Sequence, residues 1–162
     1  MKKKLLINYL IVFILTFLDQ ITKYLVVSFF NVNEYIIIIK NFLKFYYIKN
    51  IGASFGFLSG NTILIIFITL IIIFYILYEM NKNKNNRLFD VSCILILSGA
   101  FGNLIDRVCR GYVVDFISFT LFNTEMAIFN VADIFITFGV ILYIIILIME
   151  GKKNGNSSKR GR

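Results

Sequence analysis

The 162-residue chain contains no histidine, no proline and no tryptophan, and it has only two cysteines. Without histidine it cannot assemble a Ser-His-Asp triad or a Cys-His pair, which excludes the hydrolases that depend on an imidazole base. The commonest metal ligand in proteins is missing for the same reason. We interpret Cys93 and Cys109 as packing residues, because two lone thiols close to one helix are rarely a disulfide or a nucleophile.

Charged residues are also scarce. They make up 16% of the chain, against 59% hydrophobic residues, and the mean hydropathy is +0.81. Globular domains carry about 25% charged residues, so the composition predicts an integral membrane protein. The net charge of +8 comes from lysines and arginines at the termini and in one short loop. This distribution indicates membrane topology rather than nucleic-acid binding.

Four long apolar segments predict four transmembrane helices within a single domain, residues 1–150. Each segment is long enough to cross the hydrocarbon core of a bilayer. The expected helices cover about residues 5–28, 62–78, 89–109 and 130–149. Residues 62–78 are almost entirely Ile, Leu and Phe, and we interpret this second helix as a lipid-facing scaffold.

The segments between the helices differ in character. Residues 31–61 mix β-branched and aromatic residues with lysines and end in a glycine-rich stretch, which predicts a small sheet lying on the membrane. Residues 111–129 are semi-apolar and predict an outer loop, partly helical at the interface. Residues 151–162 predict a disordered basic tail.

The basic residues predict the orientation of the chain. Eleven of the 17 lysines and arginines lie before residue 5, in the 79–90 loop or after Glu150. The positive-inside rule therefore predicts that both termini are cytoplasmic and that residues 31–61 and 111–129 lie outside.

With this topology, four aspartates from three helices lie at one level, near the outer membrane interface. They are Asp19, Asp106, Asp115 and Asp133. Ionisable groups at membrane depth are costly and by default indicate a functional site. A single such aspartate is more often an ion-pair partner or a helix cap. The convergence of four is what favours function.

Charge pairing separates these acids into two groups. Asp19 and Lys23 share a helix face, and Asp106 has Arg107 and Arg110 as neighbours. Asp115 and Asp133 have no obvious cation of their own. Two unpaired carboxylates in a low-dielectric site share one proton, which is how an aspartic protease activates water.

A polar stripe accompanies the acids on the third helix. Gly99, Asn103 and Arg107 recur at every fourth residue and therefore lie on one helix face. Small residues such as Gly99 and Ala100 also permit a close approach of a second helix.

Four ordered blocks of the chain resemble the lipoprotein signal peptidase (signal peptidase II) family of bacterial inner membranes. The blocks are DQITK (19–23), NIGASF (50–55), GAFGNLIDR with GYVVDF (99–116) and FNVADIFITFG (129–139). Ile134 and Ser98 depart from the family pattern, which often has Ser and Gly at these positions. Any one block would be weak evidence, but four at consistent spacing are specific.

The resemblance implies a four-helix membrane aspartic peptidase with a small extracytoplasmic β-domain between helices 1 and 2 and an outer loop between helices 3 and 4. Such an enzyme removes signal peptides from prolipoproteins, cutting before a lipobox cysteine that carries diacylglycerol. The implied catalytic pair is Asp115 and Asp133. The implied supporting residues are Asp19, Lys23, Asn50, Gly99, Asn103, Asp106, Arg107, Asn130 and Ala132.

The resemblance also implies which other molecules take part. It implies no metal and no organic cofactor, and a location in the inner membrane. We expect a monomer. The expected partners are prolipoproteins with a lipidated cysteine and membrane lipids, with no nucleic acid.

Three other functions remain open at this level. An ion-coupled transporter also buries acids, to relay protons, and a non-catalytic membrane scaffold would tolerate Asn in place of either aspartate. A Ser–Lys dyad would use Ser54 or Ser59 with Lys49, and would place the nucleophile in the outer segment.

Overall fold

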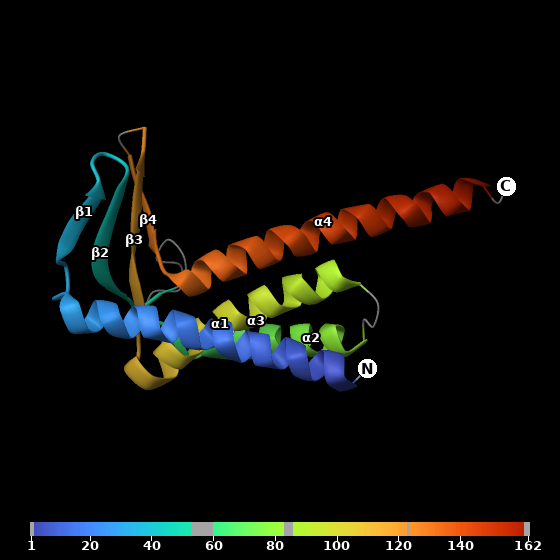
Figure 1. Cartoon of the computed structure of the whole chain (residues 1–162), viewed down its shortest axis with the longest axis horizontal. Helices are drawn as coiled ribbons and strands as arrows, with labels where there is room; N and C mark the ends of the chain where they lie inside the picture. The colour runs from blue at the N-terminus through green and yellow to red at the C-terminus, as the bar shows by residue number, and fades with distance from the viewer. Residues whose placement is uncertain (1, 53–59, 83–85, 123, 161–162) are drawn as a thin grey trace.

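The computed structural model describes residues 2–52, 60–82, 86–122 and 124–160 and the side chains of residues 3–151 within these ranges. Four long helices lie side by side, a sheet stands across one end of them, and both termini lie at the other end (Figure 1). The elements are α1 (Lys2–Phe29), β1 (Tyr35–Ile39), β2 (Leu43–Asn50), α2 (Thr62–Lys82), α3 (Arg87–Arg110), β3 (Val113–Leu121), β4 (Thr124–Phe129) and α4 (Val131–Arg160). All four helices are long and apolar enough to cross a membrane, as the sequence predicts.

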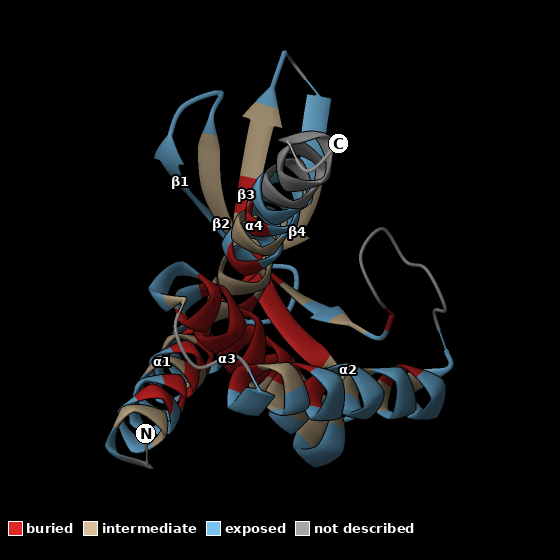
Figure 2. Cartoon of the chain, turned by 90° about the vertical axis from the view of Figure 1, so that its right-hand side faces the viewer, coloured by how far each residue is buried: buried red, intermediate tan, exposed pale blue. Residues whose placement is uncertain are grey.

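Helix α3 is the centre of the bundle, with α1, α2 and α4 arranged around it (Figure 2). In the most apolar 18-residue stretch of α3, 67% of the residues are buried, against 17–22% in the corresponding stretches of the other three helices. Small residues make this central position possible. A Cβ atom added to Gly99 would clash with the backbone carbonyl oxygen of Ala132, so the backbones of α3 and α4 approach each other closely at this level.

Local chemistry defines both ends of α3. Asn86 caps the N-terminus by accepting a hydrogen bond from the backbone N–H of Phe89 at 3.2 Å. Gly111 ends the helix in the left-handed conformation, at φ 78°, and its N–H donates to the carbonyl of Arg107. Glycine adopts this conformation without steric cost, and the turn directs the chain into β3.

The sheet is antiparallel with strand order β1-β2-β3-β4, and it corrects one prediction. Residues 111–129 were expected to form an outer loop with some helix, but they form β3 and β4. An isolated hairpin is marginally stable. Because β3 pairs with β2 from Leu43 opposite Phe119 to Asn50 opposite Val113, two hairpins far apart in the sequence form one sheet.

Two apolar clusters hold these parts together. A large cluster fills the bundle between the sheet and the termini; its buried members include Val12, Ile73, Ile76, Met80, Phe89, Leu97 and Ile146. A smaller cluster joins the sheet to the end of α1, and consists of Val26, Tyr47, Val114 and Phe116. The base of β3 is therefore fixed against the helices.

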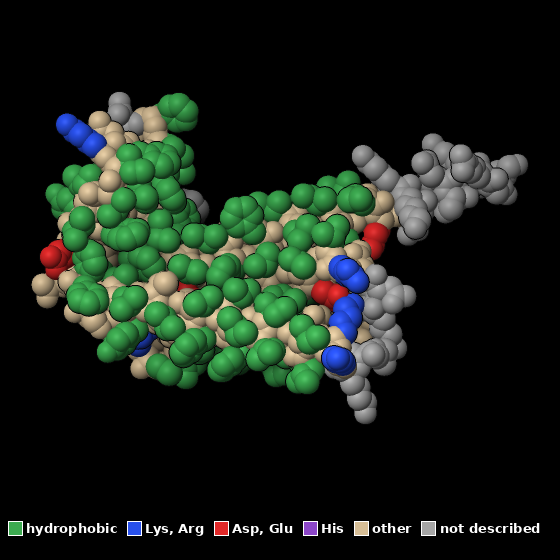
Figure 3. Space-filling model, viewed as in Figure 1, with side chains coloured by type: hydrophobic (Ala, Val, Ile, Leu, Met, Phe, Trp, Pro, Cys, Tyr) green, Lys and Arg blue, Asp and Glu red, His purple; other side chains and the backbone are tan. Residues whose placement is uncertain are grey.

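The outer surface of the bundle is apolar along its length, while the visible charged side chains gather near its two ends (Figure 3). This is the surface that a bilayer requires. The chain after residue 150 was expected to be disordered, but α4 continues to Arg160. A helix that is already formed gains one hydrogen bond for each residue added.

Candidate active site

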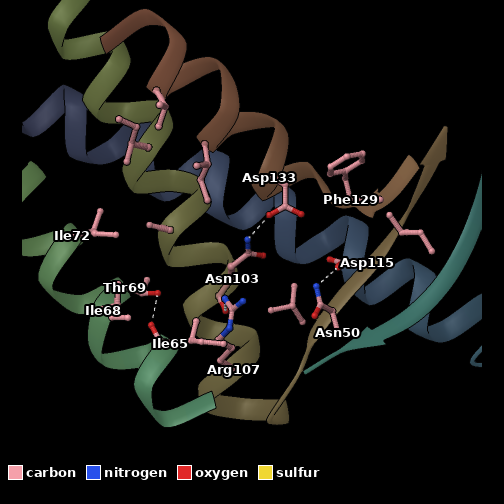
Figure 4. Close-up of a pocket in the computed structure, with 17 residues that line it drawn as sticks. Asn50, Ile65, Ile68, Thr69, Ile72, Asn103, Arg107, Asp115, Phe129 and Asp133 are labelled. Carbon is pink, nitrogen blue, oxygen red and sulfur yellow. Dashed lines mark hydrogen bonds between the residues drawn. The ribbon is translucent and has the colours of Figure 1, made fainter. Parts of the chain in front are cut away.

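Asp115 lies near the base of β3, where the sheet meets the helices, and its residue is 1% exposed. Two side-chain amides hold its carboxylate. The Nδ2 of Asn50, on the neighbouring strand β2, donates to Oδ2 at 2.8 Å, and the Nδ2 of Asn130 donates to Oδ1 at 2.6 Å. Figure 4 shows Asp115 hydrogen-bonded to Asn50, with Asp133 and its partner Asn103 close by.

Asp133 lies in the first turn of α4 and forms a reciprocal cap with Asn130. The backbone N–H of Asn130 donates to Oδ2 of Asp133 at 3.1 Å, and the backbone N–H of Asp133 donates to Oδ1 of Asn130 at 2.9 Å. The second oxygen, Oδ1, accepts from the Nδ2 of Asn103 at 2.8 Å. Because Asn130 contacts both Asp133 and Asp115, it links the two carboxyl groups in one network.

Neither Asp115 nor Asp133 forms an ion pair with a lysine or arginine in the part of the chain that the structure describes. Burial therefore raises the pKa of Asp115, and the negative charge of Asp133 raises it further, to about 7. The amides of Asn50 and Asn130 act in the opposite direction, since they stabilise the ionised form. Asp115 can hold a proton at neutral pH.

A second group of charges is fully neutralised behind this pair. The side chain of Lys23 is 0% exposed, and its Nζ lies 2.8 Å from Oδ2 of Asp19 and 3.1 Å from Oδ2 of Asp106. Asp106 also pairs with Arg110 and accepts a hydrogen bond from the backbone N–H of Val114 at 3.1 Å. Buried charges need such partners. The expected Asp19–Lys23 pair is present, and of the two cations considered for Asp106 it is Arg110 that pairs with it.

Asp19 has an additional structural role, because it reaches across to α4. Its Oδ1 accepts a hydrogen bond from the backbone N–H of Ala132 at 2.9 Å, which satisfies a free donor in the first turn of that helix. The Nε2 of Gln20 donates to Asp19 at 3.2 Å and to the carbonyl of Gly102 at 3.0 Å. A Cβ atom on Gly102 would lie 2.4 Å from Oδ2 of Asp19.

Gln20 and Gly102 were missed in the sequence analysis, although each lies inside a block that was recognised. The available signal was spacing: Gly102 follows Gly99 by one helical turn, so the small-residue face extends to the level of Asp19.

Arg107 does not pair with Asp106 and instead links α3 to the chain just after β2 by hydrogen bonds. Its guanidinium donates to the carbonyl of Gly52 at 2.9 Å and to the carbonyl of Asn103 at 3.3 Å. The N–H of Gly52 in turn donates to Oδ1 of Asn50 at 2.9 Å. Arg107 therefore helps to position the strand end that carries Asn50. Ser54 and Ser59, the serines of the alternative dyad, lie outside the described residues.

The side chains at the two positions that depart from the family pattern do not contact the carboxyl groups of Asp115 and Asp133. The hydroxyl of Ser98 donates to the carbonyl of Ile94 at 2.7 Å, within its own helix. Ile134 lines a shallow apolar groove together with Leu95 and Phe138.

A cavity of about 420 Å³ opens beside the two aspartates. Its polar lining residues are Asn50, Thr69, Asn103, Arg107, Asp115 and Asp133, and the rest are apolar. Four residues of α2 contribute to it, namely Ile65, Ile68, Thr69 and Ile72. The interpretation of the second helix as a purely lipid-facing scaffold was therefore wrong. Its composition is apolar all round, so no sequence pattern distinguishes the cavity side from the lipid side.

In the described part of the chain, no group of three or more acidic or cysteine side chains is arranged to hold a metal ion. What the site offers is two unpaired carboxyl groups, three amides that orient them, and an apolar cavity beside them. Such an arrangement can perform acid–base chemistry beside an apolar surface.

Comparisons with known proteins define the class first. The chain is similar to two solved structures described as bacterial membrane enzymes. One superimposes with a TM-score of 0.85 at 37% identity over 90% of each chain. The other has a TM-score of 0.79 at 38% identity, over 86% of this chain and 91% of that one. The fold is thus that of a multi-pass bacterial membrane enzyme.

The sequence comparisons then define the family. The model of the family described as signal peptidase (SPase) II matches residues 11–149. The lipoprotein signal peptidase of Caldanaerobacter subterraneus subsp. tengcongensis is 43% identical over 141 residues, which cover 87% of this chain and 95% of the relative. That of Staphylococcus aureus strain MRSA252 is 40% identical, over 86% of this chain and 85% of the relative. The chain belongs to the signal peptidase II family, and it is a membrane protease that processes lipoproteins.

Proposed function

We propose that the protein is an aspartic endopeptidase that cuts diacylglyceryl-modified prolipoproteins immediately before the lipidated cysteine, with Asp115 and Asp133 as its catalytic dyad. One observation carries the proposal. These two carboxyl groups lack a cationic partner among the described residues, while every other acid in the same cluster has one. Both line one cavity.

The environments of the two aspartates favour different roles. Asp115 has a pKa of about 7 because it is buried beside Asp133, so it is the member that holds the shared proton. Asp133 is the carboxylate that acts as general base, held toward the cavity by Asn103 and by the first turn of α4. A dyad with one proton can act as acid and as base in the same step.

The reaction then follows in two steps. The Asp133 carboxylate takes a proton from water, the water oxygen bonds to the scissile carbonyl carbon, and the Asp115 carboxyl gives its proton to the carbonyl oxygen. In the second step Asp133 gives its proton to the amide nitrogen, the C–N bond breaks, and Asp115 recovers a proton from the tetrahedral carbon's hydroxyl. The products are a new carboxyl terminus on the signal peptide and a free amino group on the lipidated cysteine, and the dyad returns to its starting state.

The depth of the site suits this substrate. Positive-inside counting supports a position in the cytoplasmic membrane with both termini in the cytoplasm and the sheet outside. The dyad would then lie near the outer interface, where a lipidated cysteine is anchored. Strand β2 could bind the extended peptide around the scissile bond by added-strand hydrogen bonds from its end near Asn50.

A transport function receives less support. Proton relay across the membrane would require polar groups on both sides of the bilayer centre. Between the dyad and the termini, the described core is mainly the large apolar cluster that contains Ile73, Ile76 and Leu97. Its buried polar side chains are uncharged, namely Asn8, Thr16, Ser92 and Ser98, apart from Asp90, which pairs with Lys4 near the N-terminus.

The experiment is cleavage of one purified precursor in detergent, with and without the diacylglyceryl group on its lipobox cysteine. We expect cleavage of the lipidated form only, with the modified cysteine as the new N-terminus by mass spectrometry. Cleavage at another bond, or equal cleavage of both forms, would contradict the proposed specificity.

A further inference from the structure

The cavity beside the dyad continues along the bundle as an apolar cleft between α2 and α4, with α3 as its back wall. Beyond Asp133, its lining on α4 is Ile136 and Val140, and on α2 it ends at Ile72. The cavity residues of α3 on this stretch, Ile96 and Ala100, are apolar as well. The cleft therefore leads from the dyad into the membrane interior without another charged group along its lining.

Two tyrosines meet across the gap between α2 and α4, one helical turn beyond the last lining residues of the cleft. The hydroxyl oxygens of Tyr75 on α2 and Tyr143 on α4 lie 3.5 Å apart. The ring of Tyr143 packs against Phe89, with ring centroids 5.6 Å apart, and Phe89 is a buried member of the large apolar cluster. The ring of Tyr143 is thus held against the core of the bundle, and we interpret the tyrosine pair as the floor of the cleft.

The length of the cleft is that of one membrane leaflet. Ten residues separate Asp133 from Tyr143 on α4, and at 1.5 Å per residue this is about 15 Å of helix. The hydrocarbon core of a bilayer is about 30 Å thick, so one leaflet is about 15 Å. The floor therefore lies near the level at which lipid acyl chains end.

The floor also distinguishes between the two apolar parts of a lipidated precursor. A signal helix about 10 Å wide must continue toward its charged cytoplasmic end, and the two hydroxyl groups lie in the path of a helix that stays inside the cleft. An acyl chain starts at the cysteine and ends within its own leaflet. Only the acyl chain fits a cleft that begins at the dyad and is closed at mid-membrane.

We propose that this cleft binds one acyl chain of the lipidated cysteine and that Tyr75 and Tyr143 determine the chain length it accepts. The proposal rests on the function proposed above and adds a specificity element to it. Each methylene that enters the cleft packs against its apolar walls and gains van der Waals contacts, because the surrounding lipid is already apolar. Beyond the tyrosine floor, a longer chain gains nothing further.

The test measures kcat/KM for one precursor carrying acyl chains of graded length. For the wild type we expect kcat/KM to rise with chain length and then to level off. In Tyr75→Ala and Tyr143→Ala the rise should continue by several more methylenes. The ratio of kcat/KM for the longest chains to kcat/KM for the short chains should then be severalfold larger than in the wild type. Tyr78→Ala is the matched control, because Tyr78 is 61% exposed on the same helix as Tyr75 and its ring lies under the ammonium group of Lys82 instead of facing Tyr143.

The possible failures are distinguishable. If the wild type cleaves no lipidated precursor of any chain length, the proposed function itself is wrong. If it cleaves them, but both floor variants level off at the same length as the wild type and the Tyr78→Ala control, the tyrosine floor does not select chain length. Tyr75 is half exposed, so Tyr75→Ala provides this comparison even if Tyr143→Ala destabilises the fold.

Discussion

The ammonium group of Lys23 donates a hydrogen bond to Oδ1 of Asn103 at 2.9 Å. This contact determines the orientation of the Asn103 amide, because the oxygen must face the cation and the Nδ2 must then face Asp133, at 2.8 Å. Lys23 is fully buried and hydrogen-bonds neither Asp115 nor Asp133. It nevertheless determines that the Nδ2 of Asn103, and not its oxygen, faces the dyad. The neutralised charges behind the site and the unpaired charges in it form one network.

Replacing Lys23 tests the cost of that network. In Lys23→Met the buried carboxylates of Asp19 and Asp106 lose their shared cation, and breaking a buried pair in this way costs about 3–5 kcal/mol. We expect a correspondingly large fall in unfolding free energy in detergent, together with loss of cleavage. The matched control is Lys44→Met, which breaks the more exposed pair with Glu125 and should cost about 1 kcal/mol or less. Equal effects of the two changes would contradict this account.

Asp19→Ala should act on position more than on chemistry. The variant leaves the N–H of Ala132 at the start of α4 without its acceptor, and it leaves Lys23 with one carboxylate fewer. We expect lower thermal stability and reduced cleavage together. A variant of wild-type stability that still binds substrate but does not cleave it would instead give Asp19 a direct role in the reaction.

The contact at Gly99 tests whether the distance between α3 and α4 matters for the dyad. In Gly99→Ala the new methyl group meets the Ala132 carbonyl at 2.2 Å unless the helices move apart. Overpacking of this kind costs about 1–3 kcal/mol, and the shift displaces Asp133 from Asn103. We expect activity to fall by more than tenfold. The control is Gly151→Ala on α4, where no atom lies within 4 Å of the added methyl group. This variant should behave as the wild type does.

The pH dependence follows from Asp115. Its pKa is raised from 3.8 to about 7, so the protonated form is favoured in the folded state, and its contribution to stability is present at low pH and lost as the pH rises through about 7. We therefore expect kcat/KM to fall over the same range, as the shared proton leaves. Asn50→Ala removes a donor that stabilises the carboxylate, so the fall should move to higher pH. Activity that is flat or rising through pH 7 would contradict the assignment of the proton to Asp115.

The sequence predicts the parts of this architecture that depend on local patterns. The four spans follow from hydropathy, and the pairing of Asp19 with Lys23 follows from helical spacing. The absence of a cation at Asp115 and Asp133 follows from counting charges at one depth. These are short-range rules, and they place every one of the four aspartates near the same end of the bundle.

What the sequence does not predict depends on long-range pairing and on residues without a distinctive type. Strand β3 forms because β2 offers it a partner 65 residues away, as the Asn50–Asp115 hydrogen bond shows, and the segment alone resembles an interfacial loop. The cavity face of α2 carries the same isoleucines as its lipid face. Arg107 could equally have paired with Asp106, since only the folded chain brings the Gly52 carbonyl within 2.9 Å.

The most direct test of the central claim is cleavage of a purified, diacylglyceryl-modified prolipoprotein in detergent by the wild type, Asp115→Asn, Asp133→Asn and a control, Glu125→Gln, on the exposed strand β4. We predict cleavage before the lipidated cysteine by the wild type and the control. We predict no detectable cleavage by either dyad variant, with both still folded in detergent. Normal turnover by Asp115→Asn or Asp133→Asn would contradict the dyad.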